Sequence, residues 1–317
     1  MPSIVTHYYF GNDVLKRLPT NIKKKINKEK AIYDIFLQSF DNLFYYKFFT
    51  PFLGKKERDL GYNAQKENVK KYFKNILITV KDNQTNENIS YLYGSICHYV
   101  LDSLCHPFVI YNTGLDTLNK KYNGLHEKME VNIDAQVYKY KTGTNLKDAT
   151  INNMLLPKIK FSNNLKETIN EVFYKTFNIK NMGNVYEKSM HTGNIILKYF
   201  VTDKLGIKKY IYKLRDFICH KKKYQYLSFH VTKLDPNYLN LEHNKWVYPV
   251  DNQIIKTDSF EDLYIKAIEK STYLITSIDK YLNNKIDLIE TLEVIGNTSY
   301  VTGTDCNSKK EMQYFKF

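Results

Sequence analysis

The chain has 317 residues, of which 43% are hydrophobic, and its formal net charge is +14. This length and composition allow one large domain or two ordinary ones around a substantial core, and they exclude a disordered chain. No apolar run approaches the roughly 18 residues of a membrane span, which excludes a transmembrane protein as well.

Apolar residues recur at spacings of three and four through most of the chain, whereas strand-like alternation is scarce, so the sequence predicts an all-α fold. In chain order, the expected helices cover residues 8–17, 31–48, 63–80, 90–105, 125–140, 164–177, 184–201, 207–220, 260–282 and 287–295. Residues 228–258 are the longest expected non-helical stretch, interpreted as a packed connector. We expect one domain over 1–317, with metal-site helices within 1–145 and C-terminal helices within 160–295 packing on them.

Several helix ends carry local signals. Pro107 disfavours helical geometry at the residue before it, so the helix over 90–105 is expected to end near His106. Ser259 and Asp262 form a capping pattern that opens the helix over 260–282. Gly143 and Gly296 are the expected stops of two other helices.

Five side chains of the types that bind metals lie on two of these helices. His98, Asp102 and His106 follow one another at intervals of four residues, and His126 and Glu130 repeat that interval. Side chains four apart share one helical face, so packing the two faces together would create a pocket of nitrogen and oxygen donors. That is the ligand chemistry of zinc. The alternative for each histidine is a hydrogen-bonded core residue, but five donors at helical spacing favour the metal interpretation.

The positive charge favours an anionic partner, namely a phospholipid surface, nucleic acid or a phosphate ester. The lysines are spread widely. The run from His220 to Tyr224 could steer an anionic substrate, but a solvated helix end explains it at least as well. The many aromatic residues are expected to serve core packing before base stacking.

The first residues lack the basic flank and apolar stretch of a signal peptide, which predicts a cytoplasmic location. Cys97, Cys105, Cys219 and Cys306 show no Cys-x-x-Cys spacing and are expected to be reduced. Cys97 and Cys105 precede candidate ligands but point about 100° away from them on a helix, so they are expected in the core.

Two or more zinc ions suit phosphate ester hydrolysis, because they lower the pKa of a bridging water and neutralise charge on phosphate oxygens. Carboxylates can bridge two ions and imidazoles cannot, so Asp102 is the natural bridge. His126 and Glu130, with one histidine of the first helix, can complete a three-ligand site with an open position. Asp134 lies one turn further and either orients a histidine from behind the ligands or is an exposed surface acid.

These residues resemble the zinc-dependent phospholipase C family, whose wider fold is shared with fungal single-strand nucleases. The resemblance rests on four blocks, and it extends through Asn237, Trp246 and Ser259 to most of the chain. The blocks are Thr6-His7-Tyr-Tyr-Phe-Gly, Gln38-Ser-Phe-Asp41-Asn-Leu-Phe-Tyr-Tyr, Gly94-Ser-Ile-Cys-His98-Tyr-Val-Leu-Asp102-Ser-Leu-Cys-His106-Pro107 and Leu125-His126-Glu-Lys-Met-Glu130-Val-Asn-Ile-Asp134.

The resemblance implies an all-α domain with up to three zinc ions. It implies as ligands His7, Asp41, His98, Asp102, His106, His126 and Glu130. Asp41 is also the catalytic candidate, as the residue that bridges the metals or holds the nucleophilic water.

The chain departs from the family pattern in three places. Gln65 stands where members commonly supply another histidine, and glutamine is a poor zinc ligand, so the site expected at Asp41, His98 and Asp102 is predicted to bind metal weakly. Secreted members also bind one zinc through a processed N-terminus, for which no signal peptide is recognised here. His106 follows Asp102 by four residues, slightly closer than in secreted members.

The expected function is a zinc-dependent phosphodiester hydrolase of the phospholipase C type, acting on a phospholipid or another phosphodiester, with an anionic membrane surface as a further expected partner. One alternative is a nuclease acting on single strands, which the positive charge and aromatic content favour. The other is a non-catalytic descendant that binds metal, which Gln65 favours.

Overall fold

The computed structural model describes residues 4–50, 52–115, 119–308 and 310–316, and within them the chain is mainly helical, which confirms the predicted all-α class. The helices of the N-terminal part are α1 (Ile4–Arg17), α2 (Thr20–Lys28), α3 (Lys30–Phe36), α4 (Lys55–Asn63), α5 (Val69–Asp82), α6 (Asn86–Thr113) and α7 (Leu125–Thr142). They are followed by α8 (Asn152–Leu155), α9 (Asn163–Phe177), α10 (Met182–Ile196), α11 (Ile207–Ile218), α12 (Phe260–Leu282) and α13 (Leu288–Ile295).

The helix α6 is the centre of the fold. It has 28 residues, about 42 Å at 1.5 Å per residue, and it is buried along most of its length. Both apolar and polar residues are buried along it, as expected for a helix that neighbours surround. The neighbours include α1, α2, α3, α5, α7 and α12.

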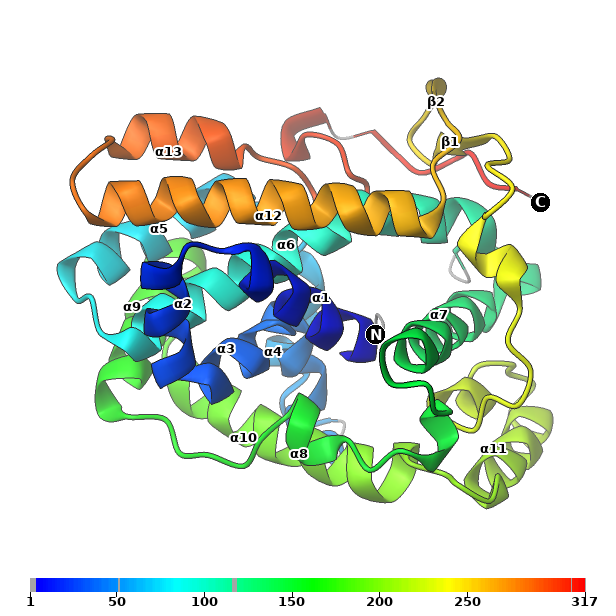
Figure 1. The fold of residues 1–317 in the computed structure, drawn as a ribbon. Helices are drawn as coiled ribbons and strands as arrows, with labels where there is room; N and C mark the ends of the chain where they lie inside the picture. The colour runs from blue at the N-terminus through cyan, green and yellow to red at the C-terminus, as the bar shows by residue number, and fades with distance from the viewer. Residues whose placement is uncertain (1–3, 51, 116–118, 309, 317) are drawn as a thin grey trace.

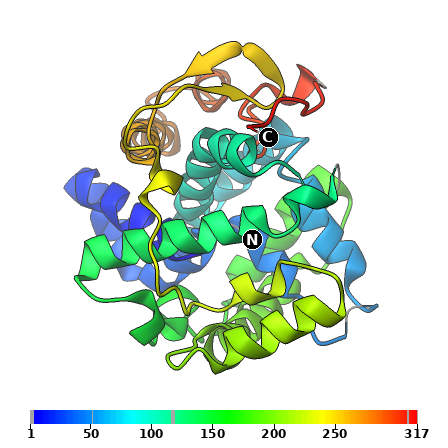
Figure 2. The ribbon, with the colours of Figure 1, turned by 90° about the vertical axis from the view of Figure 1, so that its right-hand side faces the viewer.

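The other helices form layers around α6. Figure 1 shows α12 lying across α6 and α1, with α13 folded back along α12. From the side, α7 crosses in front, α11 lies below it, and the hairpin of β1 (Trp246–Tyr248) and β2 (Asp251–Lys256) lies at the top (Figure 2). One continuous cluster of buried apolar residues extends from Ile4 to Tyr300. A single core of this kind fits the expected single domain over 1–317, whose boundaries stay a prediction.

The prediction that a helix ends at His106 was wrong, because α6 continues through Pro107 to Thr113. Proline removes the N–H that would bond the Ser103 carbonyl, a local cost. Burial of the surrounding apolar side chains outweighs it, since Pro107 and Phe108 are both buried. The backbone at Gly303 packs against this point, where an added Cβ would lie 2.5 Å from Pro107 Cγ. His106 therefore sits inside a rigid helix.

The single helix expected over 31–48 was also wrong. The helix α3 ends at Phe36, and a 3-10 segment from Ser39 to Tyr45 follows it. The break lies at Ser39, whose φ of 32° is incompatible with a continuous helix. Asp41 is therefore carried by the tighter 3-10 turn.

The helix expected over 63–80 divides in the same way. The helix α4 ends at Asn63, and α5 begins at Val69 after Asn68, which adopts a φ of 62° that asparagine tolerates well. The buried Gln65 lies in the turn between the two helices. Similarly, the helix expected over 184–201 is α10 followed by a π-helical turn, Leu197–Val201.

The predicted caps are confirmed. Ser259 and Asp262 form a reciprocal capping box at the start of α12. Gly143 ends α7 with a φ of 74°, and Gly296 ends α13 with a φ of 78°. Both values are in the region that favours glycine.

The connector over 228–258 is not wholly irregular. It contains a 3-10 turn, Pro236–Leu239, and the β1–β2 hairpin, neither of which was predicted. The Trp246 ring anchors the hairpin on α6, because its centroid lies 5.5 Å from that of Phe108 and its Nε1 donates to the Asp258 carbonyl. Among the residues that the structure describes, no helix is both long and apolar enough to span a bilayer.

Candidate metal centre

Asp102 lies at the middle of the ligand-bearing face of α6. Its Oδ2 is 3.3 Å from His98 Nε2 on one side and 3.9 Å from His106 Nδ1 on the other. All three side chains are buried, with Asp102 only 3% exposed. The interval of four residues therefore places two imidazoles around one carboxylate, as the sequence predicts.

The first donor group adds His7 to this face. His7 Nε2 lies 3.0 Å from Asp102 Oδ1, and the His7 and His98 rings are 4.6 Å apart. His7, His98 and Asp102 each offer one ligand atom, and these atoms lie within 4.8 Å of one another. The structure thus adds His7 to His98 and Asp102, while the expected participation of Asp41 stays a prediction.

Asp134 fixes the start of α1, which carries His7. Its carboxylate accepts hydrogen bonds from the Val5 and Thr6 backbone N–H groups, at 3.2 and 2.8 Å, and from the Thr6 hydroxyl at 2.7 Å. A carboxylate at a helix N-terminus satisfies free N–H groups and complements the helix dipole. Asp134 is 2% exposed, so it is not a surface acid. It acts on the residues beside His7 and not on an imidazole directly.

The second donor group joins α6 to α7. His126 Nε2 lies 2.8 Å from Glu130 Oε1, and His106 Nε2 lies 3.8 Å from the same oxygen. His106, His126 and Glu130 again offer atoms within 4.8 Å of one another. Three donors with one position left open match the arrangement of a catalytic zinc site.

Two backbone carbonyls orient the α6 imidazoles. His98 Nδ1 lies 3.2 Å from the Leu37 carbonyl, and His106 Nδ1 lies 3.0 Å from the Tyr300 carbonyl. A carbonyl only accepts hydrogen bonds, so each Nδ1 carries the proton and each Nε2 is left as the metal-facing atom. Sequence analysis missed both partners, because a backbone carbonyl has no side-chain signature.

Asp41 lies next to the first donor group and is held by Gln65. Gln65 Nε2 donates to Asp41 Oδ1 at 2.7 Å and to the Gly61 carbonyl at 3.1 Å. Both partners are acceptors, which places the NH₂ side of the amide toward the carboxylate. Asp41 is thus bound by a neutral donor at the position where the family resemblance predicts an imidazole.

The buried carboxyl groups differ in their electrostatics. Burial, and then repulsion from Asp102, raise the pKa of Asp41 to about 7. Burial acts in the same direction on Asp102, but the surrounding histidines outweigh it and hold the pKa of Asp102 below its ordinary value. Interacting carboxylates resist double ionisation, so a bound cation nearby would favour the charged form of both.

The histidines and Glu130 are likewise perturbed. Burial lowers the pKa of His98 to about 3, so this imidazole is neutral at physiological pH. Burial also opposes the charge on His106, but Asp102 and Glu130 outweigh it and raise the pKa of His106 to about 9. Burial is outweighed at Glu130 too, where His126 and His106 lower the pKa to about 2.

Unpartnered polar atoms show that these residues fit a metal. Buried atoms without a hydrogen-bond partner are rare in proteins and call for an explanation. In the described part of the chain they include three atoms of candidate ligands, namely His7 Nδ1, Asp41 Oδ2 and Glu130 Oε2. Zinc ions would satisfy donors of this kind.

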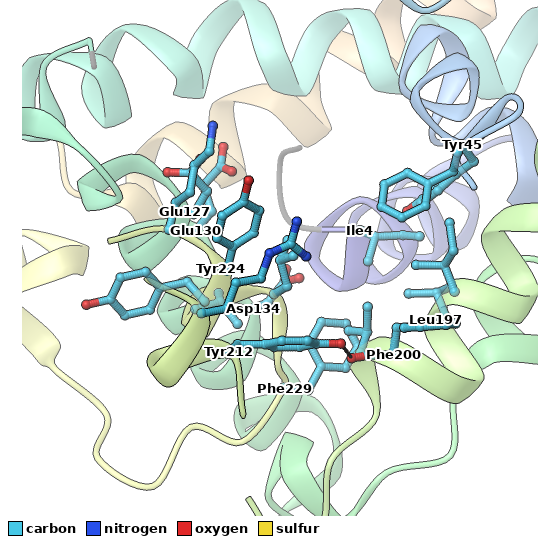
Figure 3. Close-up of a pocket in the computed structure, with 18 of the residues that line it drawn as sticks. Ile4, Tyr45, Glu127, Glu130, Asp134, Leu197, Phe200, Tyr212, Tyr224 and Phe229 are labelled. Atoms are coloured by element: carbon cyan, nitrogen blue, oxygen red, sulfur yellow. Dashed lines mark hydrogen bonds between the residues drawn. The ribbon is translucent and has the colours of Figure 1, made fainter. Parts of the chain in front are cut away.

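A cavity of about 570 Å³ opens beside the second donor group. Figure 3 shows Glu127, Glu130 and Tyr224 on one side of it, and Tyr45, Leu197 and Phe200 on the other. Most of the lining is apolar, and Arg215 and Lys223 contribute positive charge. The Tyr45 hydroxyl is buried without a hydrogen-bond partner. Burial, and then Asp41 and Asp134, raise the pKa of Tyr45, so its hydroxyl stays protonated.

One of three comparisons with known proteins identifies a family. A search of curated proteins and a search of solved structures found no match. A family model described as zinc dependent phospholipase C matches residues 6–179, a range that contains every candidate ligand. Because the match covers more than half of its length, the chain belongs to the zinc-dependent phospholipase C family.

Proposed function

We propose that this protein hydrolyses the phosphodiester bond of a phospholipid on the diacylglycerol side, as a phospholipase C. The observation that carries the proposal is the pair of buried donor groups, joined through Asp102 and His106 on α6, beside a largely apolar cavity. The zinc-dependent family supports the same chemistry.

In this proposal each donor group would hold one zinc ion, the first through His7, His98 and Asp102, the second through His106, His126 and Glu130. Bound zinc lowers the pKa of a coordinated water and stabilises negative charge on phosphate oxygens. The expected range stays one to three ions, since Asp41 offers a further unpartnered oxygen.

The residues around the two donor groups have different roles in this proposal. Asp41 Oδ2, which has no hydrogen-bond partner, accepts a hydrogen bond from the attacking water and orients it. The Tyr45 hydroxyl donates to the phosphate, because it is a buried donor in the cavity wall without another acceptor. Asp134 keeps His7 in place by holding the first turn of α1.

The cavity favours a lipid over a nucleic acid. Ile196, Leu197, Val201 and Phe229 line it with aliphatic and aromatic carbon, which suits the glycerol and acyl part of a phospholipid. Single-stranded nucleic acid instead needs stacking platforms along a basic groove. The test therefore includes both substrates.

The experiment compares zinc-loaded protein on short-chain phosphatidylcholine, a chromogenic phosphocholine ester and single-stranded DNA, with and without a chelator. We expect chelator-sensitive release of diacylglycerol. Asp41→Asn should lower it at least about a hundredfold, whereas Asp59→Asn, on the exposed face of α4, should leave it unchanged. Cleavage of DNA alone would favour the nuclease. No turnover at full zinc occupancy would favour the non-catalytic descendant.

A further inference from the structure

The helix α11 presents its apolar face to solvent, the reverse of an ordinary surface helix. Six apolar residues at helical spacing, here called the α11 face, are between 53% and 79% exposed. They are Ile207, Tyr210, Ile211, Leu214, Phe217 and Ile218. The one buried residue of this helix is Asp216, which accepts hydrogen bonds from the Tyr224 and Gln225 backbone N–H groups.

Exposing the apolar α11 face to water is unfavourable, and a binding partner that covers this face would remove that cost. Contiguous exposed apolar patches of this kind on soluble proteins mark binding surfaces. Leu205 extends the patch immediately before α11 and is 77% exposed. The polar side of the helix is committed to the fold, since Asp216 caps the following turn and the Lys209 ammonium donates to the His230 carbonyl.

The helix α11 also lines the cavity, on the side opposite the α11 face. The Tyr212 hydroxyl, from the opposite side of α11, donates to the Phe200 carbonyl at 2.8 Å, and the Phe200 ring lies 5.5 Å from that of Phe49. Tyr212, Phe200 and Phe49 all line the cavity. The helix that would bind such a surface with its apolar face therefore forms part of the cavity wall with its other side.

Basic residues flank the apolar stripe. Between residues 204 and 223 the chain carries seven lysines and one arginine against a single acid, the internally bonded Asp216. Lys213 and Arg215 lie to either side of the stripe at 100° per residue and are exposed. An exposed apolar stripe between basic flanks is the pattern of a helix that lies in the interface of an anionic bilayer.

We infer that α11 docks the protein on an anionic lipid bilayer, with the α11 face inserted among the lipids and the flanking lysines at their head groups. A second copy of the chain fits less well, because it would bring an equally basic flank of a protein whose net charge is +14. Nucleic acid would engage the lysines but leave the aliphatic residues exposed. Docking itself is independent of catalysis. Its use, to deliver phospholipid to the cavity, rests on the proposed function.

The test measures co-sedimentation with vesicles of phosphatidylcholine, either alone or with roughly one third phosphatidylglycerol. The zinc-loaded Asp41→Asn protein is used beside the unmodified one, so that hydrolysis does not alter the vesicles. We expect salt-sensitive binding to the anionic vesicles. The double variant Phe217→Ser/Ile218→Ser should weaken it at least about tenfold. The matched control is Ile289→Ser on α13, which is 69% exposed and should bind normally.

Charge is tested separately. Lys213→Glu should weaken binding about tenfold, whereas Lys24→Glu on α2 should change it less than about twofold. Phe217→Trp supplies a reporter, because the chain's only tryptophan, Trp246, is 2% exposed. Its emission should shift to shorter wavelength on anionic vesicles, and that of Ile289→Trp should not. This readout also serves if the serine variants fail to fold.

Three results would overturn the inference. One is the absence of binding to anionic vesicles at low salt, and another is an equal loss in the control variants. The third is a dimer, or a complex with single-stranded DNA, that depends on Phe217. Binding without turnover of any substrate would leave the docking intact and contradict the proposed function. Turnover of soluble substrate without vesicle binding would support the proposed function and contradict the docking.

Discussion

The side-chain amide of Gln65 donates to Asp41 Oδ1 over 2.7 Å, which locates position 65 at the edge of the metal centre. Its backbone is fixed as well, because the Gln65 carbonyl accepts from the Tyr300 N–H at 2.9 Å, and the Tyr300 carbonyl in turn bonds His106. The turn between α4 and α5 therefore contacts Asp41 through the side chain of Gln65 and reaches His106 through the backbone of Tyr300. A substitution of the Gln65 side chain therefore tests its role at the metal site and leaves the backbone hydrogen bond to Tyr300 in place.

Replacing Gln65 by histidine should therefore add metal affinity. The imidazole would supply the donor that family members commonly have, and we expect zinc content to rise by about one ion per chain, or turnover to increase. Elemental analysis and activity on short-chain phosphatidylcholine measure this. Gln84→His, far from the centre, is the control. A folded Gln65→His protein without additional zinc or turnover would contradict the assignment of position 65.

Replacing His126 by alanine should remove about one zinc ion per chain, since it leaves the second donor group with His106 and Glu130 alone. The stabilisation by zinc, taken as Tm with zinc minus Tm with chelator, should fall by roughly 5 °C. This difference cancels the effect of the substitution on the metal-free fold. His191→Ala, on α10, should change neither quantity. Unchanged zinc content in His126→Ala would disprove this ligand.

Zinc binding should release a proton from His106 at pH 7. The pKa of His106 is raised to about 9 in the metal-free site, so this imidazole is protonated below that pH, whereas zinc binds the neutral form. Raising the pH from 7 to 9 removes a competing proton, and the apparent affinity should increase about tenfold per unit. The pKa of His98 is lowered to about 3, so it releases none.

Calorimetry in buffers of different ionisation enthalpy counts the released protons. The Asp41→Asn protein is the control, because the pKa of Asp41 lies at about 7 and its carboxyl can release part of a proton too. An affinity that stays constant between pH 7 and 9 would show that His106 is not a ligand.

Gly94→Ala should destabilise the fold, although alanine is ordinarily the better helix former. An added Cβ would lie 2.8 Å from the Tyr33 carbonyl and 2.9 Å from Phe36 Cβ, so α3 and α6 would have to move apart. We expect a loss of about 1–3 kcal/mol in urea unfolding of the metal-free protein. Ser90→Ala, also buried on α6, should cost far less, because its hydroxyl has no partner to lose.

The ligand intervals on α6 and α7 were predictable because both are local. His98, Asp102 and His106 need only helical geometry to converge, and so do His126 and Glu130. Pro107 shows the limit of local signals, since its preference to end a helix was overridden by burial of the whole helix. The capping signal at Ser259 was reliable because it depends only on Asp262, three residues further along the chain, and not on distant packing.

What the sequence could not predict depends on distant packing. His7 meets Asp102 only because α1 packs on α6, and the Leu37 and Tyr300 carbonyls orient imidazoles 61 and 194 residues away. The periodicity of α11 predicts a helix, but not that its apolar face is the exposed one. Periodicity identifies the two sides of a helix, and only the packing decides which side is buried.

The last prediction concerns the reaction. Asp41→Asn keeps the shape of the side chain, and its carbonyl oxygen can still accept the hydrogen bond from Gln65. It removes the negative charge, which we propose to matter most where the attacking water is oriented and the transition state forms. Turnover should therefore fall by at least about a hundredfold in kcat, with KM changed only a few-fold. Steady-state kinetics on a soluble phosphodiester, with zinc content measured on the same samples, separate this effect from metal loss. If kcat is retained at full zinc occupancy, Asp41 is a structural carboxylate and the orientation of the attacking water must be assigned to another group.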